Sequence, residues 1–165
     1  MLRRFLSCQQ GAAAAEMALL LPLMIVMLFT GLEAGHYMYQ RHQVTKALRD
    51  GVRFAARQDF NDMSCSSGAS TAVVDATRNV TRTGQVASGG VSRIPNWQAT
   101  DITVLIDCTG VSSTVNQTGI YDSTRVGRKV VVQTDFNYTP LFGGLGIVNN
   151  SFPLDNMQQA TVMGL

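Results

Sequence analysis

The stretch AAAAEMALLLPLMIVMLFTGL, residues 12–32, decides the fold, because its 21 residues carry one charge, on Glu16. A helix rises about 1.5 Å per residue, so this run spans roughly 30 Å, the thickness of the hydrocarbon core of a bilayer. A buried helix of a soluble protein is the alternative, but such helices rarely show so long an apolar run. The sequence therefore predicts one membrane-spanning helix, which we place at residues 12–36.

The residues on either side of the apolar run indicate its orientation. Arg3 and Arg4 precede it, and residues 1–11 contain no acidic residue. By the positive-inside rule, such a basic segment stays in the cytoplasm. Tyr37 and Tyr39 follow at the far end, where interfacial aromatic residues are enriched. We therefore expect a single pass through the inner membrane, with a cytoplasmic N-terminus and a periplasmic or extracellular C-terminal domain.

The pattern after the apolar run is that of an amphipathic helix. In QRHQVTKALRDGVRFAARQ, residues 40–58, apolar residues share one face at about 100° per residue. Basic residues share the opposite face, which either is solvated or contacts anionic headgroups or the acidic surface of a partner: Lys46, Arg49, Arg53 and Arg57. We expect this helix over residues 37–60, continuous with the membrane helix. We also expect Pro22 to kink the combined helix.

Residues 61–165 are expected to form a small extracytoplasmic α+β domain. Residues 61–70 are rich in Ser, Asn, Asp and Gly and are typical of a loop, whereas residues 71–83 have the periodicity of a short helix. Alternating apolar and polar residues then predict strands of a short antiparallel sheet. The predicted strands are 102–108, 128–138 and 157–163.

The order of residues around Gly11 resembles a class III prepilin leader, in which a membrane peptidase cuts on the cytoplasmic side after glycine. A secretory signal peptide has its small residues after the apolar run, whereas here they precede it. With GAAAAEMALLLPLMIVMLFTGLEAG, QVTKALRDGVRFAAR and VVVQTDFNYTPLFGG, the chain resembles a TadE-like pseudopilin, a minor pilin of the tight-adherence (Flp-type) pilus system. The resemblance implies a structural or assembly role, processing by a prepilin peptidase between Gly11 and Ala12, and other pilins or pilus assembly proteins as partners.

Glu16 needs a partner or an interfacial position, because a carboxylate inside hydrocarbon costs several kcal/mol. After cleavage at Gly11, the new amine of Ala12 lies four residues from Glu16, one helical turn away on the same face. This pair could form within one chain or, as the resemblance implies for pilin-like assemblies, between neighbouring subunits. The alternative is that nothing is cleaved and that Glu16 lies among the cytoplasmic headgroups beside Arg3 and Arg4.

The three cysteines fall on two sides of the predicted membrane. Cys8 lies in the cytoplasmic leader, where thiols stay reduced, and would be lost on cleavage. Cys65 and Cys108 lie on the oxidising side, one in a predicted loop and one at the end of a predicted strand. We expect a disulfide between them, with two free buried thiols as the alternative.

Composition and motifs argue against several other functions. A net charge of +2 and a pI near 8.6 give no basic excess for nucleic-acid binding. The sequence has no Cys-x-x-Cys pair, H-E-x-x-H helix or Gly-rich phosphate loop, so we expect no metal, no cofactor and no catalytic residues. His36 and His42 are expected to be interfacial polar residues. Two rival functions stay open, a signal-anchored periplasmic enzyme and a secreted binding module cut after Ala34.

Overall fold

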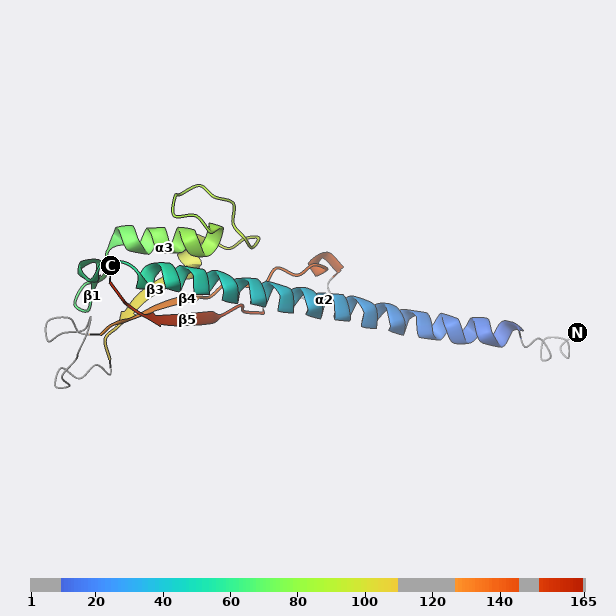
Figure 1. The fold of residues 1–165 in the computed structure, drawn as a ribbon. Helices are drawn as coiled ribbons and strands as arrows, with labels where there is room; N and C mark the ends of the chain where they lie inside the picture. Colours follow the sequence, from blue (N-terminus) through green and yellow to red (C-terminus); the bar gives the residue numbers. More distant parts are fainter. Residues whose placement is uncertain (1–9, 110–126, 146–151, 165) are drawn as a thin grey trace, which may run out of the picture.

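The protein consists of one long helix with a small α+β domain built around its C-terminal part. The computed structural model describes residues 10–109, 127–145 and 152–164. Helix α2 (Gln10–Ala56) has 47 residues and protrudes from the domain as a rod (Figure 1). It runs through Pro22, so the proline does not interrupt it. The predicted continuous helix and the α+β class are confirmed.

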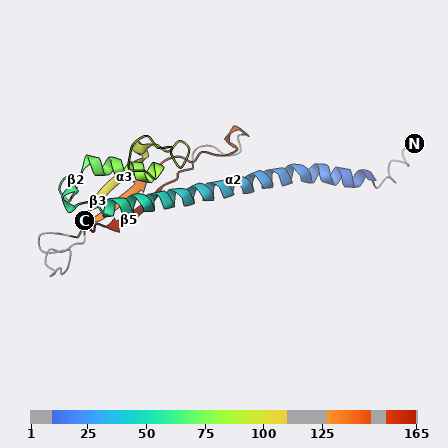
Figure 2. The same cartoon turned by 45° about the horizontal axis from the view of Figure 1, so that its top comes forward.

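The domain contains a three-stranded antiparallel sheet in the order β3-β4-β5. Its register pairs Ile102 with Thr134 and Lys129 with Thr161. Figure 2 shows α3 and the sheet gathered along the C-terminal half of α2, while the N-terminal half extends away from them. The elements are α3 (Thr71–Thr83), β3 (Ile102–Asp107), β4 (Lys129–Thr134) and β5 (Asn156–Thr161).

Several sequence-based boundaries differ from the structure: α2 ends at Ala56 instead of residue 60, and β5 covers Asn156–Thr161 instead of residues 157–163. The second strand ends at Thr134 instead of residue 138, because its regular pairing with β5 stops at Thr134 and Asn156. Pairing beyond the strand is reduced to the bridge between Asn137 and Pro153. The segment predicted as a loop contains a small hairpin, β1 (Met63–Ser64) and β2 (Gly68–Ala69), which follows the 3-10 helix η1 (Phe60–Asp62).

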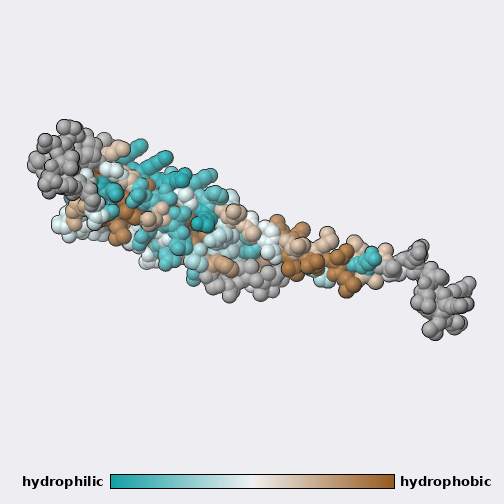
Figure 3. All heavy atoms as spheres, turned by 90° about the horizontal axis from the view of Figure 1, so that it is seen from below, coloured by the Kyte–Doolittle hydropathy of each residue, from teal (hydrophilic) through white to brown (hydrophobic). Residues whose placement is uncertain are grey.

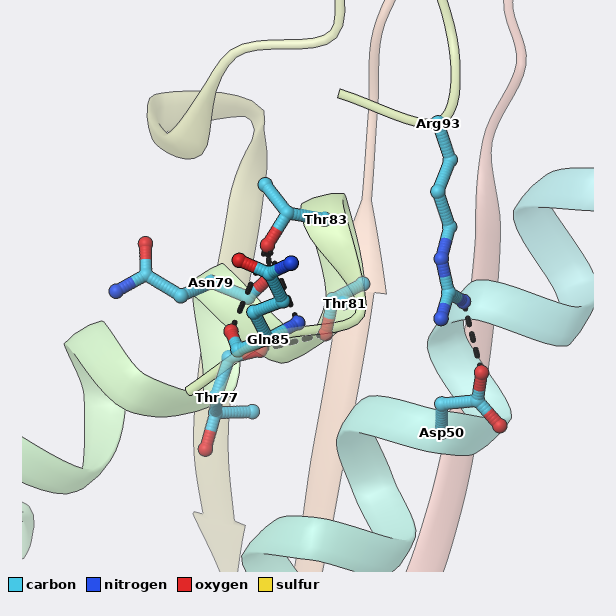
Figure 4. Close-up of polar contacts among 7 residues, drawn as sticks. All are labelled: Asp50, Thr77, Asn79, Thr81, Thr83, Gln85 and Arg93. Atoms are coloured by element: carbon cyan, nitrogen blue, oxygen red, sulfur yellow. Dashed lines mark hydrogen bonds and ion pairs between the residues drawn. The ribbon is translucent and has the colours of Figure 1, made fainter. Parts of the chain in front are cut away.

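Helix α3 begins and ends where its capping residues dictate. The Ser70 hydroxyl accepts a hydrogen bond from the Val73 N–H at the start, and Gly84 adopts a left-handed conformation, with φ of 81°, at the end. The helix packs on α2 at Gly51, where an added Cβ would come within 1.9 Å of the Thr81 hydroxyl oxygen. Figure 4 shows the threonines of α3 and, beside them, Arg93 bonded to Asp50 of α2 at 2.7 Å.

The hydrophobic core lies between α2, α3 and the sheet. Trp97 from the irregular stretch after α3 is buried in it, stacks on Phe136 and donates a hydrogen bond from Nε1 to the Thr134 hydroxyl at 2.8 Å. The C-terminal part of α2 supplies one side of this core with six buried residues, so this part of the helix belongs to the domain. They are Val44, Ala47, Leu48, Val52, Ala55 and Ala56.

Candidate functional site

The N-terminal half of α2 leaves the domain as a bare apolar rod. Ten large apolar side chains between Met17 and Leu28 are between 44% and 80% exposed. The most apolar stretch of the helix has a mean hydropathy of 2.1, none of it is buried, and it is long enough to cross a membrane. Figure 3 shows these side chains as a brown band between the domain and the N-terminal end. Water is a poor solvent for so large a continuous apolar surface.

The residues predicted for processing and pairing lie at the N-terminal end of this rod. Gly11 and Ala12 lie in the first described turn of α2, and Glu16 follows Ala12 by one turn. The Glu16 side chain is exposed, and no described residue forms a hydrogen bond or ion pair with it. Arg3 and Arg4, its alternative partners, lie outside the described residues. Processing at Gly11 and pairing through Glu16 therefore stay predictions.

A buried carboxylate, Glu33, marks the point where α2 enters the domain. Its exposed fraction is 6%. Oε1 accepts hydrogen bonds from the Tyr138 hydroxyl at 2.6 Å and from the Leu141 N–H at 3.0 Å, and Oε2 accepts one from the Phe142 N–H at 3.0 Å. Charge-assisted bonds of this kind are roughly twice as strong as neutral ones. Glu33 therefore attaches the segment after β4 to the helix, and we call this set of three bonds the Glu33 clamp.

Aromatic and imidazole rings surround the Tyr138 side of the clamp. Tyr37 packs edge-on against Tyr138 with ring centroids 5.2 Å apart, and Nδ1 of His36 lies 2.8 Å from the Tyr138 hydroxyl. Because the hydroxyl proton goes to Glu33, Nδ1 of His36 acts as the donor. Burial, together with the hydrogen bond to Glu33, raises the pKa of Tyr138 above its ordinary value. Tyr138 therefore stays protonated and keeps its donor at any physiological pH.

The clamp extends toward the apolar rod through Phe142. Its ring meets Phe29 of α2 edge-to-face, with centroids 4.8 Å apart. Sequence reasoning missed Glu33, because a single acid at the end of an apolar run resembles a membrane boundary. Its partners follow it by 105 to 109 positions in the chain. The available signal was the alternation over residues 128–138, which places Tyr138 on the same face as Val130 and Val132.

The two cysteines on the domain side are joined. Cys65 of the β1–β2 turn forms a disulfide with Cys108, which follows β3, and their Cα atoms are 6.0 Å apart. The predicted pairing is therefore present, and it ties the small hairpin to the end of the sheet. Cys8 lies outside the described residues.

The N-terminal part of the chain matches a known family. Residues 11–53 match the family model described as TadE-like protein. Over these residues the chain is similar to TadE-like proteins. The TadE-like segment includes the bare apolar rod, Glu16 and Glu33, and it ends inside the domain core. No curated protein and no solved structure shows significant similarity to the chain.

The histidines and acidic residues of α2 do not gather into a metal-binding cluster among the described residues. No group of three or more His, Cys, Asp and Glu residues there is placed to hold a metal ion. His36 contacts the Tyr138 hydroxyl beside the Glu33 clamp, whereas His42 is exposed. The predicted basic face is exposed as well, with Lys46, Arg49 and Arg53 turned away from the core.

Proposed function

We propose that this protein is a minor pilin or pseudopilin, a structural or assembly component of a tight-adherence type pilus. The observation that carries the proposal is the coincidence of the TadE-like match, residues 11–53, with an apolar helix that projects from a folded domain. Such a helix has two uses, retention in the membrane before assembly and packing against other helices afterwards. The proposal includes residues 12–36 as the membrane-spanning segment, an N-terminus in the cytoplasm and the domain on the outer side of the inner membrane.

The proposed maturation step is cleavage by a prepilin peptidase between Gly11 and Ala12. Mass spectrometry of the protein recovered from membranes tests it, and we expect a mature N-terminus at Ala12. Gly11→Leu should keep the leader while membrane insertion is unchanged. Gly31→Ala, a change elsewhere in the same helix with nothing within 4 Å of the new Cβ, is the matched control and should be processed normally. An N-terminus at Met1 in cells with an active prepilin peptidase would contradict the step.

The proposed subunit contact uses Glu16 and the amine of Ala12 created by cleavage. Glu16→Gln keeps the size of the side chain and removes its charge, so we expect normal cleavage but impaired co-purification with other pilus components and fewer pili. Glu16→Asp keeps the charge and should restore part of the loss. If Glu16→Gln matches the wild type in both measurements, Glu16 is an interfacial residue and pairs with no amine.

The Glu33 clamp favours retention of the helix over release of a secreted module. Signal-peptidase cleavage after Ala34 would separate Glu33 from the domain and leave the Tyr138 hydroxyl and two backbone N–H groups without their acceptor. A hydrogen bond to a charged group contributes about 1.5–3 kcal/mol, and this contribution would be lost at each of the three donors. Membrane fractionation separates the two functions, since the secreted module predicts a soluble mature chain and the pilin predicts a membrane-bound one.

A further inference from the structure

The segment between β4 and β5 differs in composition from the rest of the chain. Residues 136–154, FNYTPLFGGLGIVNNSFPL, contain no charged residue, whereas 15% of the whole chain is charged. Asp135 and Asp155 stand immediately outside this segment. A connection that runs over a soluble surface ordinarily carries polar and charged side chains. This connection has no charged side chain, and the described part of it includes the apolar Leu141, Phe142 and Phe152.

The Glu33 clamp holds this segment at the end of the bare apolar rod. Phe142 packs on Phe29, which is the first residue of the rod to be partly covered, and Glu33 binds the N–H groups of Leu141 and Phe142. Figures 1 and 2 show the described residues after β4, in orange, reaching beyond the end of the sheet toward the N-terminal part of α2. Its position along the helix is therefore determined by specific contacts.

Apolar side chains at this place are left uncovered by the domain. Leu141 is 56% exposed and Phe152 is 53% exposed. Phe152 also borders an apolar groove of about 310 Å³ along α2, whose other lining residues are Thr30, Glu33, Ala34, Tyr37 and Tyr138. The groove and the two side chains continue the apolar surface of the rod instead of forming a separate patch.

The position of these side chains agrees with the edge of a bilayer. A hydrocarbon core needs about 20 helical residues. Counted from Ala13, the start of the apolar helix, 20 residues end near Leu32, at the level of Phe29 and Glu33. Irregular backbone is tolerated at such depth only where its polar groups have partners. The clamp supplies acceptors for the two N–H groups nearest the rod.

We infer that Leu141, Phe142 and Phe152 form a second membrane contact, seated in the interface of the outer leaflet beside α2. The inference rests on the proposed membrane span, and it adds that the domain rests on the lipid surface instead of standing clear of it. Aromatic side chains favour this interfacial region. The occupant of the groove is therefore lipid.

Quenching of tryptophan emission by brominated phospholipid acyl chains tests the inference on the full chain. The protein is reconstituted in phosphatidylethanolamine and phosphatidylglycerol vesicles at a high lipid-to-protein ratio. The native Trp97 is buried in the core, at 1% exposure, and serves as the unquenched background. Leu141→Trp and Phe152→Trp probe the proposed contact. Met24→Trp, on the bare rod, reports insertion, and Val91→Trp, 90% exposed on the domain, is the matched control that should stay unquenched.

We expect brominated lipid to remove emission from Met24→Trp, Leu141→Trp and Phe152→Trp, and to leave Val91→Trp and the wild type unchanged. If Met24→Trp is quenched while both segment probes are not, the membrane span stands and the inference is overturned, whether water or a second copy of the chain covers the segment. If Met24→Trp is itself unquenched, the membrane span fails and the inference fails with it. If one of the two segment probes is as little quenched as Val91→Trp while the other is quenched, the contact is confined to the quenched side chain and the three-residue surface is overturned.

Discussion

Replacing Glu33 with glutamine should release the segment that this carboxylate holds. The three donors at the site are the Tyr138 hydroxyl and the N–H groups of Leu141 and Phe142, with the first two on Oε1 and the third on Oε2. A glutamine has one acceptor oxygen, so in either orientation of its amide an NH₂ group faces at least one backbone N–H. A buried donor without an acceptor costs about 1–3 kcal/mol, which corresponds to a roughly 5- to 150-fold shift in the local opening equilibrium.

Amide hydrogen exchange of the full chain in bicelles measures this shift. We expect at least one of the Leu141 and Phe142 amides to exchange about 5 to 150 times faster in Glu33→Gln, while the amides of β4 keep their protection because the opening is local. Tyr138→Phe is the matched control, since it removes the hydroxyl donor and leaves both backbone bonds to Glu33 in place. Wild-type exchange of both amides in Glu33→Gln would refute the clamp.

Three further predictions follow from the packing of the domain. Gly51→Ala should lower the free energy of unfolding, because overpacking against Thr81 typically costs about 1–3 kcal/mol and exceeds the roughly 1 kcal/mol that alanine gains in a helix. In a Thr81→Ala background the same change should become neutral or stabilising. Urea unfolding followed by Trp97 emission measures both effects, and an equal loss in the two backgrounds would contradict the close contact. Reduction of the Cys65–Cys108 disulfide, whose cysteines are 43 positions apart, should lower the free energy of unfolding by about 4 kcal/mol. A urea midpoint that a reductant leaves unchanged would contradict this stabilisation. Burial and the bond to Glu33 raise the pKa of Tyr138, so an absorbance titration should show a tyrosine step above the ordinary value near 10, and Tyr138→Phe should remove that step. The stabilising contribution of Tyr138 is complete below the ordinary value and declines as the pH rises further.

Periodicity and composition predicted the regular elements well. The apolar run and the amphipathic pattern after it specified α2, and the capped helix over residues 71–83 matches α3. The alternation in RKVVVQTDFNY placed Val130, Val132 and Tyr138 on one face, and all three are buried, although β4 itself ends earlier. Which side of a strand is buried is encoded locally, whereas the point where pairing stops depends on the partner strand.

Contacts between distant segments could be predicted from the sequence only where the membrane topology left few possible partners. The Cys65–Cys108 pair could be predicted because, once Cys8 is assigned to the cytoplasm, two cysteines remain on the oxidising side. The Glu33 clamp had no such constraint. Two of its three donors are backbone N–H groups, which every residue except proline possesses, so no side-chain pattern indicates which of them a carboxylate will bind. The close approach at Gly51 was likewise hidden, since the same glycine also fits an ordinary apolar helix face.

The continuity of α2 from its apolar end into the domain core has a mechanical consequence. From Phe29 to the end of the helix the chain rises about 40 Å without a hinge. Transmembrane helices tilt by about 20° on average, and a tilt of this size would carry the far end of the domain, where β1 lies, sideways by about 14 Å. In the proposed membrane orientation, a force that pulls, tilts or turns the helix would therefore be transmitted directly to the far end of the domain, and the protein would act as a lever and not as a tethered head.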